Sequence, residues 1–399
     1  MISINFNLGI GKSTTISINN FINKKKEISY EAITYTINIA LVIFTILTIL
    51  YFLKKFDFYD FTKIYEHLLY LLIGFIITIF FITFEGILQG NKKFKSISIF
   101  NLFFFSLSVS IPSLLLIYNK DLLIGNLIFI SLLIKFFSIL AMFFIIKNNN
   151  LYKYSKNKIL YKNLKVNSKW ITLNSVLIQF YDLFDKYLIK YFLGPIAVAT
   201  YSIPQQLTGK LSIISKSFSA FLLPNLSKKK INNLDFNFSL LIFTKYIPIF
   251  IFILFPFYPI ILQLWLGNSY NETIYNLTKI FSLSVIFSCA SHILITKFEA
   301  TKTLYKNLKI ELYLMPLFLF LLFFLTSKNF SLFNIAILIL LKETILFFIR
   351  LNFLKLEIID FKKYYFFSLY FLLILFLSFL KDSFYYLSLV PLIVILFKK

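Results

Sequence analysis

The sequence contains few of the residues that build catalytic and metal-binding sites. Its 399 residues include one cysteine, two histidines and a single arginine, Arg350. Cys289 therefore cannot form an internal disulfide, and no Cys/His spacing typical of a zinc site occurs. No Ser/His/Asp set indicates nucleophilic catalysis. We expect a protein that is not an enzyme and that binds neither a metal nor a cofactor.

Acidic residues are also scarce. The chain has 17 Asp and Glu against 41 Lys and Arg, which gives a formal net charge of +24. Such an excess can indicate nucleic-acid binding. Here the lysines are divided among short segments and form no continuous basic face. We therefore expect no nucleic-acid partner and instead expect contact with anionic lipid head groups.

Apolar residues dominate what remains, at 59% of the chain with a mean hydropathy of +0.81. A soluble protein of this length would need a larger polar shell. A membrane-spanning helix needs about 20 largely apolar residues. Twelve candidates lie at roughly 30–53, 64–88, 96–118, 121–146, 170–193, 198–224, 238–265, 273–296, 305–326, 330–350, 361–380 and 383–397, with a weaker one at 2–22. Continuous apolar runs rather than alternating strands predict an all-α polytopic membrane protein of about 13 spans.

The basic residues alternate along this pattern. Twenty-six of the 41 fall in every second gap between the segments, and six fall in the alternating gaps. Lysine-rich gaps stay on the cytoplasmic side of membranes, so the C-terminus is predicted to be cytoplasmic. Counting back through thirteen spans places Met1 outside, although nothing in residues 1–11 favours export of a free N-terminus.

Two groups of residues recur along the chain. Lys12 and the run 24–26 return 204 residues later as Lys216 and 228–230, and Gln89 to Phe94 has a counterpart in Glu299 to Leu304. Parallel repeats of this kind are a recurrent transporter architecture. We expect an N-terminal bundle (1–146), a basic cytoplasmic linker (147–169), a C-terminal bundle (170–352) and two additional helices (353–399). The segment 170–193 has no partner in the first half, so we expect a first helix to be missing upstream of Met1.

Several short motifs follow one another in a characteristic order. The clearest is Asp185-Lys186-Tyr187, which runs into Leu193-Gly194-Pro195 and then Tyr201; Leu223-Pro224 and Leu266-Gly267 follow. The first half contributes Leu8-Gly9-Ile10-Gly11 and Gly86-Ile87-Leu88-Gln89-Gly90-Asn91-Lys92-Lys93-Phe94. In order and spacing the chain resembles the polysaccharide (O-antigen) flippases of the multidrug/oligosaccharidyl-lipid/polysaccharide exporter (MOP) superfamily.

This resemblance implies a transporter of two pseudo-symmetric helix bundles with the multidrug-exporter-like fold. It would move undecaprenyl-diphosphate-linked oligosaccharide across the bacterial inner membrane by alternating access, for O-antigen, capsule or exopolysaccharide assembly. The partners would be this substrate, membrane lipids, a polysaccharide polymerase and glycosyltransferases, and the protein would be a monomer. A drug or cation exporter or a lipid II flippase of the same superfamily stays an alternative. An O-antigen polymerase is disfavoured by the short outer gaps and the single arginine.

Nine lysines lie inside the hydrophobic segments, where a charge is expensive. Lys12 and Lys216 each precede a lysine run by twelve residues, about 18 Å of helix within a core about 30 Å thick. Lys135 lies at a similar depth. We predict that these three line a cationic cavity that binds the diphosphate. The alternative is that each pairs with a buried carboxylate or lies at a seam between helices.

Acidic and amide side chains gather in the segments 170–193 and 198–224. Asp182 and Lys186 are spaced for an ion pair on one helix face. An acid here can couple transport to an ion by protonation, but we favour an ion pair at an outer gate or solvation at the interface. Cavity polar groups for sugars or ion coupling are expected among Asp182, Asp185, Lys186, Asn174, Gln205, Gln206 and Lys210, which can equally form a helix seam.

Overall fold

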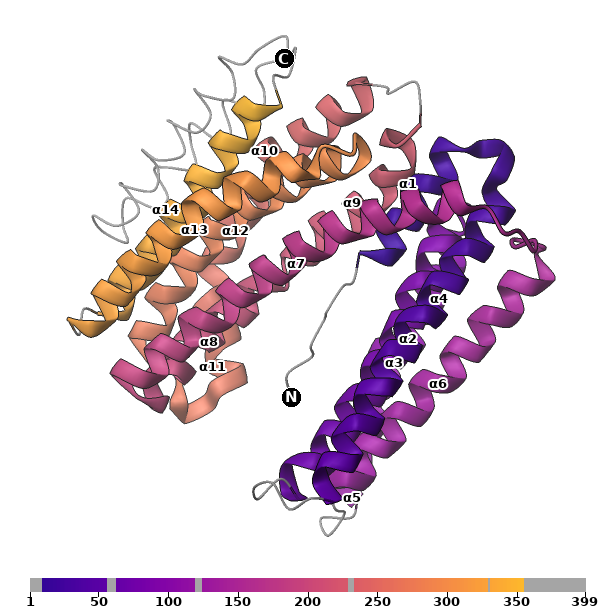
Figure 1. Ribbon diagram of the computed structural model, residues 1–399. Coiled ribbons are helices and arrows are strands. Elements are labelled where there is room, and N and C mark those ends of the chain that lie inside the picture. The colour runs from indigo at the N-terminus through magenta and orange to yellow at the C-terminus, as the bar shows by residue number, and fades with distance from the viewer. Residues whose placement is uncertain (1–8, 56–61, 119–123, 229–232, 329–330, 355–399) are drawn as a thin grey trace. The chain divides into compact units, whose positions relative to one another are not determined.

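The computed structural model describes residues 9–55, 62–118, 124–228, 233–328 and 331–354. Every regular element in these ranges is helical (Figure 1). The α-helices are α1 (Ile10–Asn20), α2 (Lys25–Lys55), α3 (Thr62–Gly90), α4 (Phe94–Asn101), α5 (Ser108–Tyr118), α6 (Ile124–Asn148), α7 (Lys158–Leu193), α8 (Pro195–Gly209), α9 (Ser212–Leu226), α10 (Asn233–Leu254), α11 (Tyr258–Leu266), α12 (Glu272–Ala300), α13 (Leu304–Ser327) and α14 (Leu332–Phe353).

The helices confirm the predicted all-α class. Within the described residues, 8 helical stretches are long and apolar enough to cross a membrane. They correspond to eight of the ten predicted spans from 30–53 to 330–350; the predicted spans 170–193 and 198–224 are helical but are not among these eight. The weaker candidate at 2–22 contains α1. The additional helices expected at 361–380 and 383–397 lie outside the described residues. The basic stretch 147–169 is helical from Lys158 onward, because α7 begins there.

Three predicted spans are interrupted in the structure. The stretch 198–224 is two helices, α8 and α9, separated at Lys210 and Leu211 just after Gly209. The stretch 238–265 is broken by a 3-10 turn, Phe255–Phe257, and the stretch 96–118 contains a π-helical turn, Leu102–Leu107, ahead of Pro112. Glycine and proline destabilise a continuous α-helix, whereas hydropathy alone does not detect the break.

The chain divides into two compact units. Unit 1 comprises residues 1–179, 220–231 and 299–305, and unit 2 comprises 180–219, 232–298 and 306–399. Unit 1 thus contains the N-terminal helices together with two short segments from the second half of the sequence. These two segments are the end of α9 and the turn after α12.

Unit 1 is built around α3, which packs against α1, α2 and α6. The contact with α1 depends on glycine: a Cβ added at Gly86 would lie 2.3 Å from the carbonyl oxygen of Gly11. Small residues let two helix backbones approach this closely. The Thr15 hydroxyl donates to the carbonyl of Gly86 at 3.0 Å across the same contact. Two of the motifs that carry the family resemblance therefore pack against each other.

In unit 2 the most enclosed helix is α12. In its apolar 18-residue stretch, 83% of the residues are buried, whereas the buried share in the other candidate spans is at most 44%. Its Ser282 hydroxyl donates to the Tyr258 hydroxyl at 2.8 Å, and Phe281 contacts the buried ring of Tyr201. Hydroxyl pairs of this kind hold helices together where no water is available.

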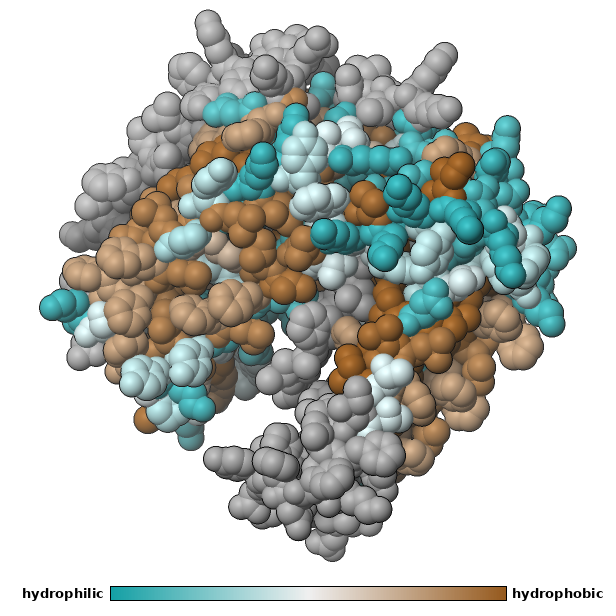
Figure 2. All heavy atoms as spheres, viewed as in Figure 1, coloured by the Kyte–Doolittle hydropathy of each residue, from teal (hydrophilic) through white to brown (hydrophobic). Residues whose placement is uncertain are grey.

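The surface of the helices is largely apolar. Large hydrophobic side chains such as Ile117, Phe137 and Leu264 are exposed along them. Figure 2 shows hydrophilic residues gathered mainly where α7 begins in unit 1, and hydrophobic residues over the sides of the helices. An apolar flank with a polar end is what a bilayer requires. The chain is a multi-pass membrane protein.

Candidate functional site

The repeat predicted from the sequence has a counterpart in the backbone. Lys92 and Lys302 both adopt a φ of 59°, which is uncommon for residues other than glycine. The N–H of Lys92 donates to the carbonyl of Gln89 at 2.9 Å, and that of Lys302 to Glu299 at 3.1 Å. The ends of α3 and α12 therefore form the same turn, each followed by a new helix.

A group of side chains around these two turns, which we call the turn cluster, lies within unit 1. Its main contact is an ion pair of 2.7 Å between the Lys12 ammonium and the Glu299 carboxylate. The side-chain amide of Gln89 donates to the carbonyl of Ala220. Further members are Lys92 with Asn225 at 3.0 Å, the rings of Phe94 and Phe221, and Lys302 above the ring of Phe21.

Charge is concentrated at the turn cluster. Burial, followed by the positive charges of Lys228 and Lys25, lowers the pKa of the Lys92 ammonium. Burial likewise lowers the pKa of Lys302. The cluster therefore gathers several cations around one buried acid, Glu299.

The structure gives Lys12 a carboxylate partner, which is the alternative left open by the sequence. Its side chain is 39% exposed, while that of Glu299 is 3% exposed. The ammonium lies at the level of the last turn of α12 rather than halfway along that helix. The count assumed one continuous helix from Lys12 to the lysine run, whereas α1 ends at Asn20 and a 3-10 turn, Ile22–Lys24, precedes α2. Lys12 is therefore eight residues, about 12 Å, from the end of its helix.

Lys216 and Lys135 have different surroundings. Lys216 is exposed on α9 in unit 2, where it interacts electrostatically with Asp182. Lys135 is half-buried on α6 in unit 1, with its ammonium 5.4 Å from the ring centroid of Phe104. Lys12 and Lys135 belong to unit 1 and Lys216 to unit 2, and their joint lining of one cavity stays a prediction.

Asp185 is a buried acid of unit 2 that accepts hydrogen bonds from its neighbours. It is 1% exposed and accepts hydrogen bonds from the Tyr201 hydroxyl at 2.7 Å and from the N–H of Lys186 at 2.6 Å. The amide of Gln205 is a more distant donor at 3.5 Å. Tyr201 is itself fully buried, so this bond ties α8 to α7. Asp185 is thus a hydrogen-bonded interior carboxylate rather than one solvated at the interface.

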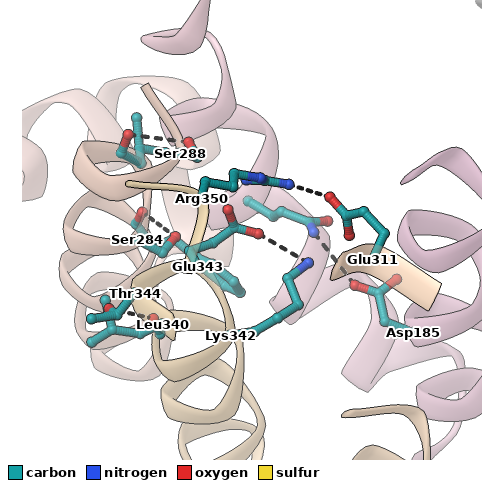
Figure 3. A network of polar contacts seen from close by, with 12 residues as sticks. Asp185, Ser284, Ser288, Glu311, Leu340, Lys342, Glu343, Thr344 and Arg350 are labelled. Carbon is teal, nitrogen blue, oxygen red and sulfur yellow. Dashed lines mark hydrogen bonds and ion pairs between the residues drawn. The ribbon is translucent and has the colours of Figure 1, made fainter. Parts of the chain in front are cut away.

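Lys342 was not singled out by the sequence analysis, yet it is central to this region. Its ammonium lies 3.0 Å from the Glu343 carboxylate (Figure 3). The same ammonium lies 3.7 Å from the ring centroid of Tyr181. It is also the strongest charge partner of Asp182, ahead of Lys186. The available signal was its place at the middle of α14, where an intramembrane lysine is a functional candidate.

A second buried pair lies on α13 and α14. The guanidinium of Arg350 forms an ion pair with Glu311 (Figure 3). Its Nε–H also donates to the amide oxygen of Asn307 at 2.8 Å. All three residues are buried. Because one guanidinium binds both Glu311 and Asn307, Arg350 cross-links α14 to α13.

The remaining candidates are spread along α7 and α8. Asn174 is buried, Lys186 is half-buried, and Gln206 and Lys210 are exposed. The hydroxyl of Tyr181 and the amide oxygen of Gln205 are buried without a hydrogen-bond partner. In the described ranges no three His, Cys, Asp or Glu residues come together in a group that could hold a metal ion. These helices therefore present polar groups with unused hydrogen-bonding capacity.

Comparison with known proteins connects this geometry to transporters. No family model matches the chain. A Shigella flexneri protein named "Putative O-antigen transporter" is 25% identical over 225 residues, which are 54% of this chain. The chain spans about half of the length of that relative, 52%.

Solved structures match over more of the chain. A MOP superfamily transporter from Pyrococcus furiosus superimposes with a TM-score of 0.69 at 14% identity, covering 90% of this chain and 84% of that one. The Vibrio cholerae MATE transporter VcmN in its bent form gives 0.71 at 15% identity, covering 88% and 84%. A MATE transporter in complex with MaL6 gives 0.70 at 14%, covering 90% and 85%.

At this identity the structures establish the fold. The match to the MATE structure covers 90% of this chain, and the curated relative carries the O-antigen name that the sequence motifs indicated. The chain is therefore a multi-pass membrane protein with the MOP superfamily fold, and the resemblance to the flippases of that superfamily is confirmed.

Proposed function

We propose that this chain is a non-enzymatic transporter that moves lipid-linked oligosaccharide, carried on undecaprenyl diphosphate, across the bacterial inner membrane by alternating access. The observation that carries the proposal is the match to the O-antigen transporter of Shigella flexneri within a shared fold. The net charge of +24 adds support, because the head group of such a carrier is anionic.

The diphosphate is proposed to bind lysine. An ammonium provides strong charge with little geometric demand, which suits a flexible diphosphate. Among Lys12, Lys135 and Lys216, the exposed Lys216 is the most available for an anion, while Lys12 already contacts Glu299. The sugar hydroxyls are proposed to form hydrogen bonds with polar side chains of α7 and α8 and of the residue after α8, namely Asn174, Gln205, Gln206 and Lys210.

A drug or cation exporter is the second candidate, since the MATE structures share this fold. Its supporting observation is the group of acids in unit 2, Asp182, Asp185 and Glu343, which a cationic substrate would need. However, Glu343 already pairs with Lys342, and Asp185 is satisfied by Tyr201. Two of the three acids are therefore already engaged, whereas Asp182 is exposed, as Lys216 is.

Deletion of the gene separates the two candidates. A flippase predicts loss of the surface glycan and accumulation of the lipid-linked oligosaccharide on the cytoplasmic leaflet. A drug exporter predicts a normal surface glycan with greater sensitivity to cationic drugs. An unchanged glycan in the deletion strain would reject the proposal.

Substitution of Lys216 tests the anion site. We expect Lys216→Gln to lower glycan export roughly tenfold or more, because a hydrogen bond to a charged group contributes about 1.5–3 kcal/mol. Lys245→Gln is the matched control, since Lys245 is a half-buried lysine of α10 beside Tyr246. Export is compared at equal membrane levels of protein, and equal export by both variants would contradict the assignment.

A further inference from the structure

The two halves of the repeat make reciprocal contacts in the turn cluster. Glu299, at the end of α12, contacts Lys12 on α1. Its counterpart Gln89, at the end of α3, contacts Ala220 on α9, one helical turn after Lys216. In each case the residue three positions before the positive-φ lysine reaches the repeat-equivalent helix of the other half.

The chemistry of the two contacts differs at a single position. The second half has an acid, Glu299, where the first half has the neutral Gln89. The Lys12 contact is therefore an ion pair, whereas Gln89 donates to the backbone carbonyl of Ala220. A lysine that neutralises an acid is poorly placed to bind an anion as well.

Separation of the Lys12–Glu299 ion pair is energetically unfavourable. The Glu299 side chain is 3% exposed, so separation from Lys12 leaves a buried and uncompensated carboxylate. Breaking a buried ion pair in this way is strongly destabilising. Lys302 above the ring of Phe21 joins the same two segments, and Lys302 is exposed. Lys92 with Asn225 and Gln89 with Ala220 instead join the end of α3 and its turn to α9. The pair therefore acts as the strongest single bond that fixes the end of α12 on α1.

We propose that the duplicated lysines have separate roles: Lys12 and Glu299 form a latch on the side of the lysine-rich turns, and Lys216 is the lysine that binds the anionic carrier. Opening toward that side requires the Lys12–Glu299 pair to separate. The second part of the proposal rests on the proposed function, whereas the latch does not.

The latch is tested by crosslinking without any substrate. Cys289→Ala removes the only cysteine, and Phe21→Cys with Lys302→Cys then places thiols at the second contact between the end of α1 and the turn after α12. The full-length protein in membranes is treated with a short bifunctional thiol reagent. We expect Glu299→Gln and Lys12→Gln each to lower the crosslinked fraction severalfold. Lys12→Arg, which keeps the cation, and the charge-reversed Lys12→Glu/Glu299→Lys protein are expected to crosslink as the parent does.

Two results would overturn the latch. One is equal crosslinking by the parent and both neutral variants. The other is a charge-reversed protein that crosslinks no better than Glu299→Gln. If the neutral variants do not accumulate in the membrane, the charge-reversed and Lys12→Arg proteins decide the question, because reversal keeps an ion pair only if the two side chains face each other.

Glycan export tests the division of roles. Lys216→Gln is expected to lower export and leave crosslinking unchanged, whereas the charge-reversed latch is expected to export at the parental level. Loss of export on charge reversal with the latch intact would show that Lys12 itself contacts the carrier. Should gene deletion leave the glycan unchanged, the proposed function fails, while the crosslinking result still decides the latch.

Discussion

Lys342 illustrates at the residue scale how an intramembrane charge is accommodated. Its ammonium has a carboxylate on one side and the face of Tyr181 on another, and both partners lie in unit 2. Carboxylate and aromatic face together replace the water that a lysine loses on burial. Adjacent helix residues point in different directions, so a pair between Lys342 and Glu343 requires the long lysine side chain to fold back.

Removing this cation should destabilise the protein. We expect Lys342→Met to lower the free energy of unfolding by on the order of 3 kcal/mol, the low end for a broken buried pair. The low end applies because the two side chains retain 13% and 18% exposure. The measurement is the thermal unfolding midpoint of the purified protein in detergent.

The double substitution separates charge from packing. Lys342→Met/Glu343→Gln should recover most of the lost stability, because no lone carboxylate then remains. Lys245→Met, at a lysine 5.7 Å from the ring centroid of Tyr246, controls for removal of an intramembrane lysine. A midpoint for Lys342→Met equal to that of this control would refute the role of the pair.

At the scale of the element, glycine determines how closely α1 and α3 approach. A Cβ at Gly86 would meet the backbone of Gly11, and one at Gly90 would meet the side chain of Ile18. Backbone atoms cannot rotate away as a flexible side chain can. The distance between these two helices is therefore fixed by residues that have no side chain.

Gly86→Ala should consequently destabilise unit 1. Alanine normally stabilises a helix relative to glycine by about 0.5–1 kcal/mol, but overpacking a tight contact costs about 1–3 kcal/mol. Gly125→Ala on α6 is the matched control, since its added Cβ would meet only the Tyr70 hydroxyl, at 3.9 Å. The unfolding midpoint should fall for Gly86→Ala and stay equal or rise for Gly125→Ala. A rise for both would mean that α1 and α3 do not approach at Gly86.

At the scale of the whole molecule, the distribution of lysine predicts the orientation in the membrane. The basic stretch 147–169 is expected in the cytoplasm, and the nearly neutral gap 266–272 is expected outside. Lys156 and Asn268 are exposed residues in these two places. Each offers a position for a single thiol in the cysteine-free Cys289→Ala protein.

Labelling of intact spheroplasts with a membrane-impermeant maleimide tests this orientation. Asn268→Cys should react in intact spheroplasts, and Lys156→Cys should react only after lysis. Both variants should label equally in detergent, which controls for reactivity of the thiol. The opposite pattern would invert the topology and place the turn cluster on the outer side.

Apolar runs and alternating lysines were sufficient to predict the helical class and most of the described spans, whereas the superfamily resemblance depended on the order of short motifs such as Asp185-Lys186-Tyr187 and Leu193-Gly194-Pro195. These properties follow from local chemistry: about 20 apolar residues span a bilayer, and lysine resists translocation. The repeat was also visible, because Lys92 and Lys302 occupy equivalent places in the chain. The break after Gly209 was not predicted, because hydropathy does not depend on backbone hydrogen bonding.

The partners of the charged side chains were decided only by the tertiary structure. Glu299 reaches Lys12 across 287 positions of sequence, and Tyr201 reaches Asp185 by the return of α8 against α7. The spacing along one helix predicted an ion pair between Asp182 and Lys186. In the structure the electrostatic interaction of Asp182 with Lys342 from α14 is stronger than that with Lys186. Sequence determined where charges enter the membrane, because insertion depends on composition. Packing determined which charges neutralise one another, because electrostatic energy depends on distance in space.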